Sequence, residues 1–289
     1  MPGRDVGRSV ATETPIKEAS MHSTSTTTGT AAAEGRLWSV RADAWAAIQE
    51  RQVEPAYHAA LDALEIGPRT RLLDVGCGAG MFLRVAADRG ADVTGIDASE
   101  GLLAHARKRV PGAPLTQGEI ESLPYEDGSF DVVTGFNSFQ FAAHPAAALA
   151  EAKRVAVDRG RVLLLTWAPP ELCEATGYLV ALGVLMPAPP PGAPGPFALS
   201  DTEALTALFR EAGLDVVAVQ DIECVWRYGD QASAIAGLMC SGPVVGVIEH
   251  AGEQAVRDAT VTFLEPFRTD DGGFRITNTF RYVIGTSRS

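Results

Sequence analysis

Apolar residues follow two spacings along the middle of the chain, and the two spacings alternate. Short apolar runs bounded by polar or turn residues are typical of buried strands. They predict strands at 72–75, 92–96, 114–117, 130–137 and 161–167. Between them, apolar residues recur every three or four positions, as in helices. This spacing predicts helices at 81–87, 99–109 and 146–157. Such alternation predicts an α/β fold with a doubly wound sheet.

The N-terminal end follows a different pattern. Residues 1–35 are rich in Ser, Thr, Ala and Gly and hold too little bulky apolar surface to offset the entropy of ordering, so we expect a disordered tail. Residues 36–66 show helical spacing that includes several aromatic side chains, and we expect two helices there. Residues 67–289 then form the main domain.

The pattern changes again after residue 167. Residues 186–197 form a proline- and glycine-rich run, which suits a loop across a pocket mouth or a surface connector. A capping box at 200–203 predicts the start of an amphipathic helix that stops at Gly213. Alternating segments at 216–228 and 274–285 then predict two long strands around a helical stretch.

Composition and charge narrow the function classes. The 289 residues are 46% hydrophobic and 21% charged, which is ordinary for a soluble globular protein. The net charge of −12 argues against a nucleic-acid or anionic-membrane partner and favours a small-molecule substrate. The four cysteines show no paired spacing, and no apolar run approaches the length of a membrane span. We therefore expect a cytoplasmic protein without a metal, either a monomer or a homodimer.

A strand, a tight turn and a helix meet at residues 71–80, where glycine fills positions 76, 78 and 80. Glycines let the backbone turn sharply and let a ligand approach closely, and the next helix offers free N–H groups. A dinucleotide fingerprint would place its last glycine where Met81 stands. The turn therefore predicts a nucleotide-type ligand, with an imperfect match to NAD.

The segment 73–80, Leu-Asp-Val-Gly-Cys-Gly-Ala-Gly, resembles the first motif of class I S-adenosylmethionine (SAM)-dependent methyltransferases, and the chain looks most like their UbiE-like, type 11 group. The resemblance implies a Rossmann-like seven-stranded sheet that ends in a C-terminal antiparallel hairpin. It also implies an N-terminal helical lid at 36–66 and a helical cap over the acceptor at 168–200 and 229–268. The implied cofactor is SAM, which leaves as S-adenosylhomocysteine (SAH).

Two acids have specific expected roles in this cofactor site. Asp97 ends the second strand about 19 residues after Gly78, where a carboxylate can accept hydrogen bonds from ribose hydroxyls. Glu119 occupies the position at which the family has an acid for the adenine amino group. The full expected cofactor set is Asp74, Gly76, Cys77, Gly78, Gly80, Asp97, Ala98, Glu119, Ile120, Phe136 and Asn137.

The acceptor side has fewer signals. Methyl transfer from a sulfonium needs in-line alignment, and it needs a general base only when the nucleophile carries a proton. The candidate bases are His144, His58 and Tyr57. The candidate substrate residues are Gln140, Trp45 and Trp167.

The predicted function is methyl transfer from SAM to a small molecule, such as a quinone-like, aromatic or indole-type compound of secondary metabolism. Two alternatives stay open at this point. The first is an NAD-dependent oxidoreductase, because such enzymes share the glycine turn and the acid. The second is a protein of the same fold that keeps the cofactor site as a non-methylating auxiliary or binding protein.

Overall fold

Seven strands form one sheet in the computed structural model, which describes residue 3 and residues 29–187 and 197–287. The strands are β1 (Arg71–Val75), β2 (Asp92–Asp97), β3 (Leu115–Gln117), β4 (Phe130–Phe136), β5 (Ala156–Trp167), β6 (Leu214–Tyr228) and β7 (Phe274–Ser287). Their order is β3-β2-β1-β4-β5-β7-β6, and β7 runs antiparallel to both neighbours. The predicted α/β fold with a C-terminal antiparallel pair is confirmed.

Helices cover both faces of this sheet, which explains why its strands are apolar at successive positions. Leu72 packs in the core beneath α3 (Glu54–Ala63) and α4 (Met81–Asp88), whereas its neighbour Leu73 packs in the core beneath α6 (Pro145–Val155) and α8 (Thr202–Glu211). The remaining helices on the β1–β5 side are α5 (Glu100–Arg109) and the single turn η3 (Phe139–Phe141).

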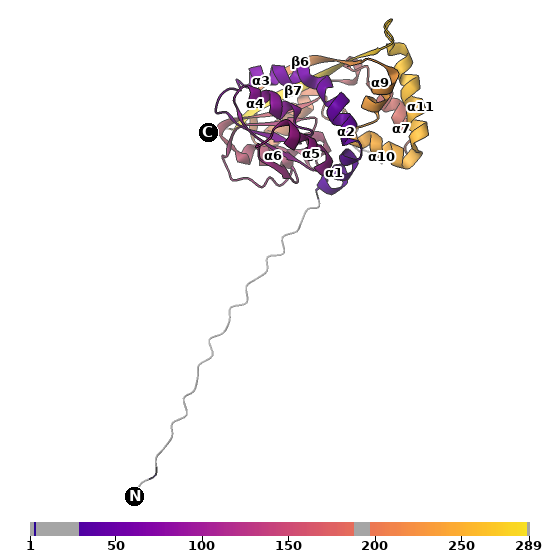
Figure 1. The fold of residues 1–289 in the computed structure, drawn as a ribbon. Coiled ribbons are helices and arrows are strands. Elements are labelled where there is room, and N and C mark those ends of the chain that lie inside the picture. Colours follow the sequence, from indigo (N-terminus) through magenta and orange to yellow (C-terminus); the bar gives the residue numbers. More distant parts are fainter. Residues whose placement is uncertain (1–2, 4–28, 188–196, 288–289) are drawn as a thin grey trace.

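A second helical layer stands at one end of the molecule (Figure 1). It consists of η4 (Pro170–Leu172), α7 (Thr176–Val184), α9 (Gln231–Leu238), α10 (Gly242–Ala251), α11 (Glu253–Leu264) and η5 (Glu265–Phe267). The N-terminal elements lie between this layer and α5. They are α1 (Ala31–Val40), α2 (Ala42–Ala44), the π-helical turn η1 (Trp45–Gln49) and the 3-10 turn η2 (Glu50–Val53).

The N-terminal prediction needs two corrections. Helix α1 begins at Ala31, so residues 31–35 are helical and do not belong to a disordered tail. The reason is a contact that sequence spacing does not reveal, because Glu119 accepts a hydrogen bond from the Ala31 N–H in the first turn. The predicted pair of helices is also broken into more elements, with the π-helical turn η1 between them. The rest of the predicted tail, residues 1–2 and 4–28, lies outside the described residues, as does the segment 188–196 of the proline-rich run.

Two local boundaries also differ from the prediction. Helix α6 ends at Val155 and β5 starts at Ala156, so residues 158–160 form a bulge in the strand where a separating turn was expected. Helix α8 is capped by Asp201, whose carboxylate accepts from the Ala204 N–H at 2.8 Å, one residue later than the predicted cap.

Candidate functional site

The glycine turn lies between β1 and α4 and is tied to β2 by its backbone. The N–H groups of Gly76 and Cys77 both donate to the carbonyl of Ile96, at 2.8 and 3.0 Å. Gly76 has a φ of +74°, and a β-carbon there would lie 2.3 Å from the Ser138 β-carbon. Glycine is therefore needed at position 76 both for its backbone angle and for close packing against the segment after β4.

Asp97 lies beside this turn, at the carboxyl end of β2. Its two oxygens accept from the N–H groups of Gly78 and Ser99, each at 2.8 Å. Burial raises the pKa of Asp97 to about 6, although the two backbone donors act in the opposite direction. Each carboxylate oxygen has a further lone pair, so Asp97 can still accept from ligand hydroxyls.

Glu119 lies across the same edge of the sheet and contacts α1. One of its oxygens accepts from the Ala31 N–H at 2.9 Å, and the other accepts from the Glu121 N–H at 3.3 Å. The Thr30 hydroxyl donates to the Phe141 carbonyl at 2.7 Å. The start of α1 is thus attached to the sheet domain on both sides of the site.

A cavity of about 650 Å³ lies along the carboxyl ends of β1, β2 and β4. Its sheet side is lined by Gly76, Gly78, Asp97, Glu119, Phe136 and Asn137. Its cap side is apolar and largely aromatic, lined among others by Trp167, Tyr178, Leu182, Trp226, Val244 and Phe280. Among the described residues that line the cavity, the only charged ones are the acids Glu34, Asp97 and Glu119.

Four lining residues carry a buried polar atom that has no hydrogen-bond partner among the described residues. They are Trp45 (Nε1), Ser138 (Oγ), Gln140 (Oε1) and Trp226 (Nε1). Unpaired buried polar atoms are unfavourable, so their grouping around one cavity indicates a polar ligand. This set, together with the Asp97 and Glu119 carboxylates, fits a nucleoside with an amino-acid end.

Comparison with known proteins agrees with this geometry. The family model described as "Methyltransferase domain" matches residues 73–164, from the first strand to the fifth. A demethylmenaquinone methyltransferase of Beutenbergia cavernae is 36% identical over 112 residues, which is 39% of this chain and 47% of that protein. Over residues 73–164 the chain is therefore similar to methyltransferase domains.

Two further matches define how far this likeness extends. An uncharacterized 37.1 kDa transposon protein of Streptomyces fradiae is 32% identical over 198 residues, or 62% of this chain and 53% of that protein. The chain thus spans about half the length of these curated relatives. The crystal structure of the Bacillus subtilis YcgJ protein has the same fold, with a TM-score of 0.54, 21% identity and coverage of 81% of this chain and 98% of that one.

Most of the site residues predicted from the sequence line the cavity. They are Trp45, Tyr57, Gly76, Gly78, Asp97, Ala98, Glu119, Ile120, Phe136, Asn137, Gln140 and Trp167. Asn137 has a φ of +52°, which is uncommon for a residue other than glycine, at the point where β4 meets the cavity. Such strained positions concentrate at functional sites.

Three residues of the predicted cofactor set do not line the cavity. They support the glycine turn on the side that faces away from the cavity. Asp74 is buried and accepts from the Thr134 hydroxyl at 2.7 Å, and burial raises its pKa to about 8. The Cys77 thiol is buried next to Gly95, and burial raises the pKa of Cys77 well above its usual value. Gly80 packs against Ala106 of α5.

Neither candidate histidine base reaches the cavity. His144 is exposed at the start of α6, where its backbone N–H donates to Glu121. His58 is exposed on α3, with its Nε2 3.7 Å from Glu54. A position at a helix start accounts for His144 and a helix-surface position accounts for His58, and neither position requires a catalytic role.

Tyr57 does line the cavity, with its ring edge-on to Phe136 at 4.9 Å between centroids. Burial, and then the nearby Glu50 carboxylate, raise the pKa of Tyr57 well above its usual value. The phenol therefore stays protonated near neutral pH, so it can donate a hydrogen bond but is a poor general base.

Glu34 is a lining residue that sequence reasoning missed. It lies on α1 and accepts from the Trp38 indole N–H at 3.1 Å, and burial raises the pKa of Glu34. Trp226 was also missed, although Cys224, Trp226 and Tyr228 alternate along β6 and all point inward. That period of two was the available signal.

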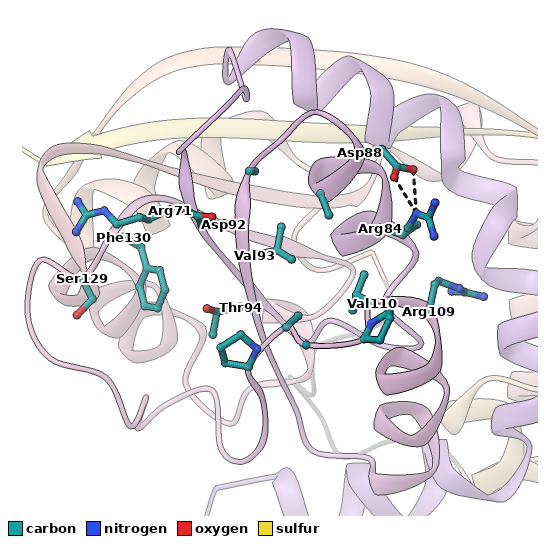
Figure 2. A pocket seen from close by; sticks show the side chains of 16 residues that line it. Arg71, Arg84, Asp88, Asp92, Val93, Thr94, Arg109, Val110, Ser129 and Phe130 are labelled. Atoms are coloured by element: carbon teal, nitrogen blue, oxygen red, sulfur yellow. Dashed lines mark hydrogen bonds and ion pairs between the residues drawn. The ribbon is translucent and has the colours of Figure 1, made fainter.

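A second hollow, of about 570 Å³, lies at the opposite end of the strands, where β1, β2 and β4 begin (Figure 2). It contains three arginines, and each is paired with a carboxylate. Arg71 pairs with Asp131 at 2.6 Å, Arg84 with Asp88 at 2.9 Å, and Arg109 with Glu50. These pairs leave little positive charge for an anionic ligand.

The described residues contain neither a cluster of metal ligands nor a single membrane-spanning helix. No group of three or more His, Cys, Asp or Glu side chains is arranged to hold a metal ion there. Within the same residues, no single helix is long and apolar enough to cross a membrane, and only α9 and α10 together, bent by 93°, pass that test of length and composition.

Proposed function

We propose that this chain binds SAM in the cavity and transfers its methyl group to an uncharged small molecule held on the cap side. The single observation that carries the proposal is the joint lining of one cavity by the glycine turn, Asp97 and an aromatic cap. A cofactor site that opens directly into a second, apolar compartment suits a reaction between two bound small molecules.

The contacts of the chain support two cofactor-binding roles. Asp97, beside Gly78, would accept from the ribose hydroxyls, and Glu119 would accept from the adenine amino group. When bound, SAM supplies a methyl group that is already activated by its sulfonium. The task of the protein is then to align the acceptor and exclude water.

The acceptor-binding side favours a flat, apolar compound. The ring centroid of Trp167 lies 5.7 Å from that of Trp226, edge-on, and 4.6 Å from that of Phe280, tilted, and all three residues line the cavity. No lysine, arginine or histidine is present among the described lining residues to neutralise an anion. These features support a quinone-like, aromatic or indole-type acceptor of secondary metabolism over a carboxylate or phosphate compound.

A base, where the acceptor requires one, would be Glu34. Of the other titratable side chains in the described lining, Asp97 and Glu119 are assigned to the nucleoside, and Tyr57 and Tyr178 are buried phenols. Burial raises the pKa of Glu34 and makes its carboxylate a stronger base than an exposed one.

The test is a binding and turnover experiment. Purified protein is titrated calorimetrically with SAM, SAH and NADH, and is then incubated with SAM and a panel of neutral aromatic compounds while SAH release is measured. Binding of SAM and SAH with acceptor-dependent SAH release supports the proposal. Binding of NADH alone would refute it, and SAM binding without turnover across the panel would favour the non-methylating auxiliary role.

A further inference from the structure

The indole of Trp45 stands next to the glycine turn. Trp45 begins the π-helical turn η1 and lines the cavity. A β-carbon at Gly78 would lie 3.6 Å from its Nε1 atom, so the indole nitrogen is in direct contact range of the turn. This nitrogen is buried without a hydrogen-bond partner among the described residues. π-helical turns inside α-helical segments are frequent at functional sites.

A partly buried ion pair fixes Trp45 relative to the turn. One nitrogen of Arg109 donates to the Ala79 carbonyl in the glycine turn at 2.9 Å, and the other donates to the Ala46 carbonyl next to Trp45 at 3.0 Å. Arg109 also pairs with Glu50, which is 3% exposed and accepts from the Met81 N–H at 3.4 Å. One guanidinium thus bridges the two turns, and only its planar fork can do so.

We propose that Trp45 is a cofactor-binding residue, whose indole N–H donates to the α-carboxylate at the amino-acid end of SAM, and that Arg109 and Glu50 are its positioning residues. The inference rests on the proposed SAM-binding function. It replaces the acceptor role predicted for Trp45 from the sequence.

The choice of Trp45 follows from the donors that the cavity offers. A carboxylate entering this cavity meets no cationic side chain among the described lining residues, so neutral donors must hold it. The Trp38 N–H is already used by Glu34, and the Trp226 N–H lies beside Trp167 on the cap side. The Trp45 N–H is the unpaired indole donor that lies at the glycine turn.

The experiment compares two ligands that differ by the amino-acid end. SAH carries the α-carboxylate, whereas 5′-methylthioadenosine lacks the whole amino-acid end but keeps the ribose and adenine. Calorimetric titration of the Trp45→Phe variant should show SAH affinity reduced roughly ten- to hundred-fold, with methylthioadenosine affinity unchanged. Tyr125→Phe is the control, because Tyr125 is a half-buried aromatic residue that does not line the cavity, and its affinity for both ligands should equal that of the wild type.

A second variant tests the positioning pair. Arg109→Lys keeps the charge but cannot reach both carbonyls, so it should also lose SAH affinity while keeping methylthioadenosine affinity. Equal losses for both ligands, or unchanged SAH affinity in folded Trp45→Phe, would overturn the inference and leave SAM binding intact. If Ser138→Ala alone weakens SAH selectively, the carboxylate donor is Ser138 and the inference is also overturned. A wild type that binds neither ligand would instead refute the proposed function.

Discussion

Cofactor affinity should fall in mild acid because of one residue, Asp97. Its burial raises its pKa to about 6. Its two oxygens already accept hydrogen bonds from backbone N–H groups, one in the glycine turn and one at the N-cap of α5. Ribose hydroxyls would donate to the ionised carboxylate, so ligand binding requires the proton to leave. Affinity should therefore depend on the ionised fraction of Asp97.

The magnitude follows from this pKa. At pH 5, about one unit below it, roughly one molecule in eleven carries ionised Asp97, so SAH affinity should fall about tenfold from its value at pH 7.5. Asp97→Asn keeps the shape but removes the charge. Its SAH affinity at pH 7.5 should be lower by about 1.5 to 3 kcal/mol, or roughly tenfold or more, with little change on going to pH 5.

The contribution of Asp97 to the stability of the free protein should have the opposite pH dependence and increase in mild acid. A carboxyl whose folded pKa is raised from 3.8 to about 6 stabilises the fold fully below pH 3.8, and this contribution is lost as the pH rises through 6. SAH should therefore raise the melting temperature more at pH 7.5 than at pH 5. The assay is calorimetric titration at both pH values, with circular dichroism to check folding. Equal wild-type affinity at the two pH values would refute the reasoning, and a pH dependence retained by Asp97→Asn would assign it to another acid.

Four further predictions concern stability and chemistry. Asp74→Asn should raise the melting temperature at pH 9 more than at pH 5, because the stabilisation from a carboxyl with its pKa raised to about 8 is lost as the pH rises through that value. Gly76→Ala should destabilise the fold by about 1 to 3 kcal/mol in urea unfolding, because its φ is +74° and the new β-carbon would lie 2.3 Å from a neighbouring side chain. Glu34→Gln should lower kcat and flatten the acidic limb of the pH–rate profile, measured as SAH release. His144→Ala and His58→Ala should leave kcat within about twofold of the wild type, because neither side chain lines the cavity.

Gly112→Ala also has a positive φ, but its β-carbon would meet nothing within 4 Å, so it separates backbone strain from collision. If Gly76→Ala is no worse than Gly112→Ala, the contact with Ser138 has been overestimated. An Asp74→Asn protein whose melting temperature follows the wild type at every pH would contradict the raised pKa. A tenfold loss in His144→Ala would restore that histidine as a base.

The parts of the fold that depend on local pattern could be predicted from sequence. Both faces of β1 are buried, so Leu72 and Leu73 form a continuous apolar run that defines an interior strand. The glycine turn and Asp97 were predictable because a strand end, a turn and a helix start determine their positions within about 25 residues.

The missed features depend on contacts between distant segments. Nothing near Glu50 in sequence indicates that it pairs with Arg109, which is 59 positions away. The start of α1 is held by Glu119, 88 positions away, so composition alone placed it in a disordered tail. His144 was chosen as a candidate base for its residue type, whereas its place at the start of α6 leaves it exposed and outside the cavity lining.

The packing of α1 has a consequence for the order of folding. Arg36 on α1 pairs with Glu249 on α10, 213 positions later, and α1 also packs on α5 (Figure 1). The ribosome releases α1 before α10, so α1 can pair with α10 only after the roughly 200 residues between them have emerged. Until then, the Trp38 and Trp45 side chains are more exposed to solvent than in the folded protein. Helix α1, which lines the ligand cavity, is thus synthesised before α10 but packs in its final position only after α10 has formed. A ligand that binds only the finished cavity would therefore selectively stabilise full-length chains over partly synthesised ones.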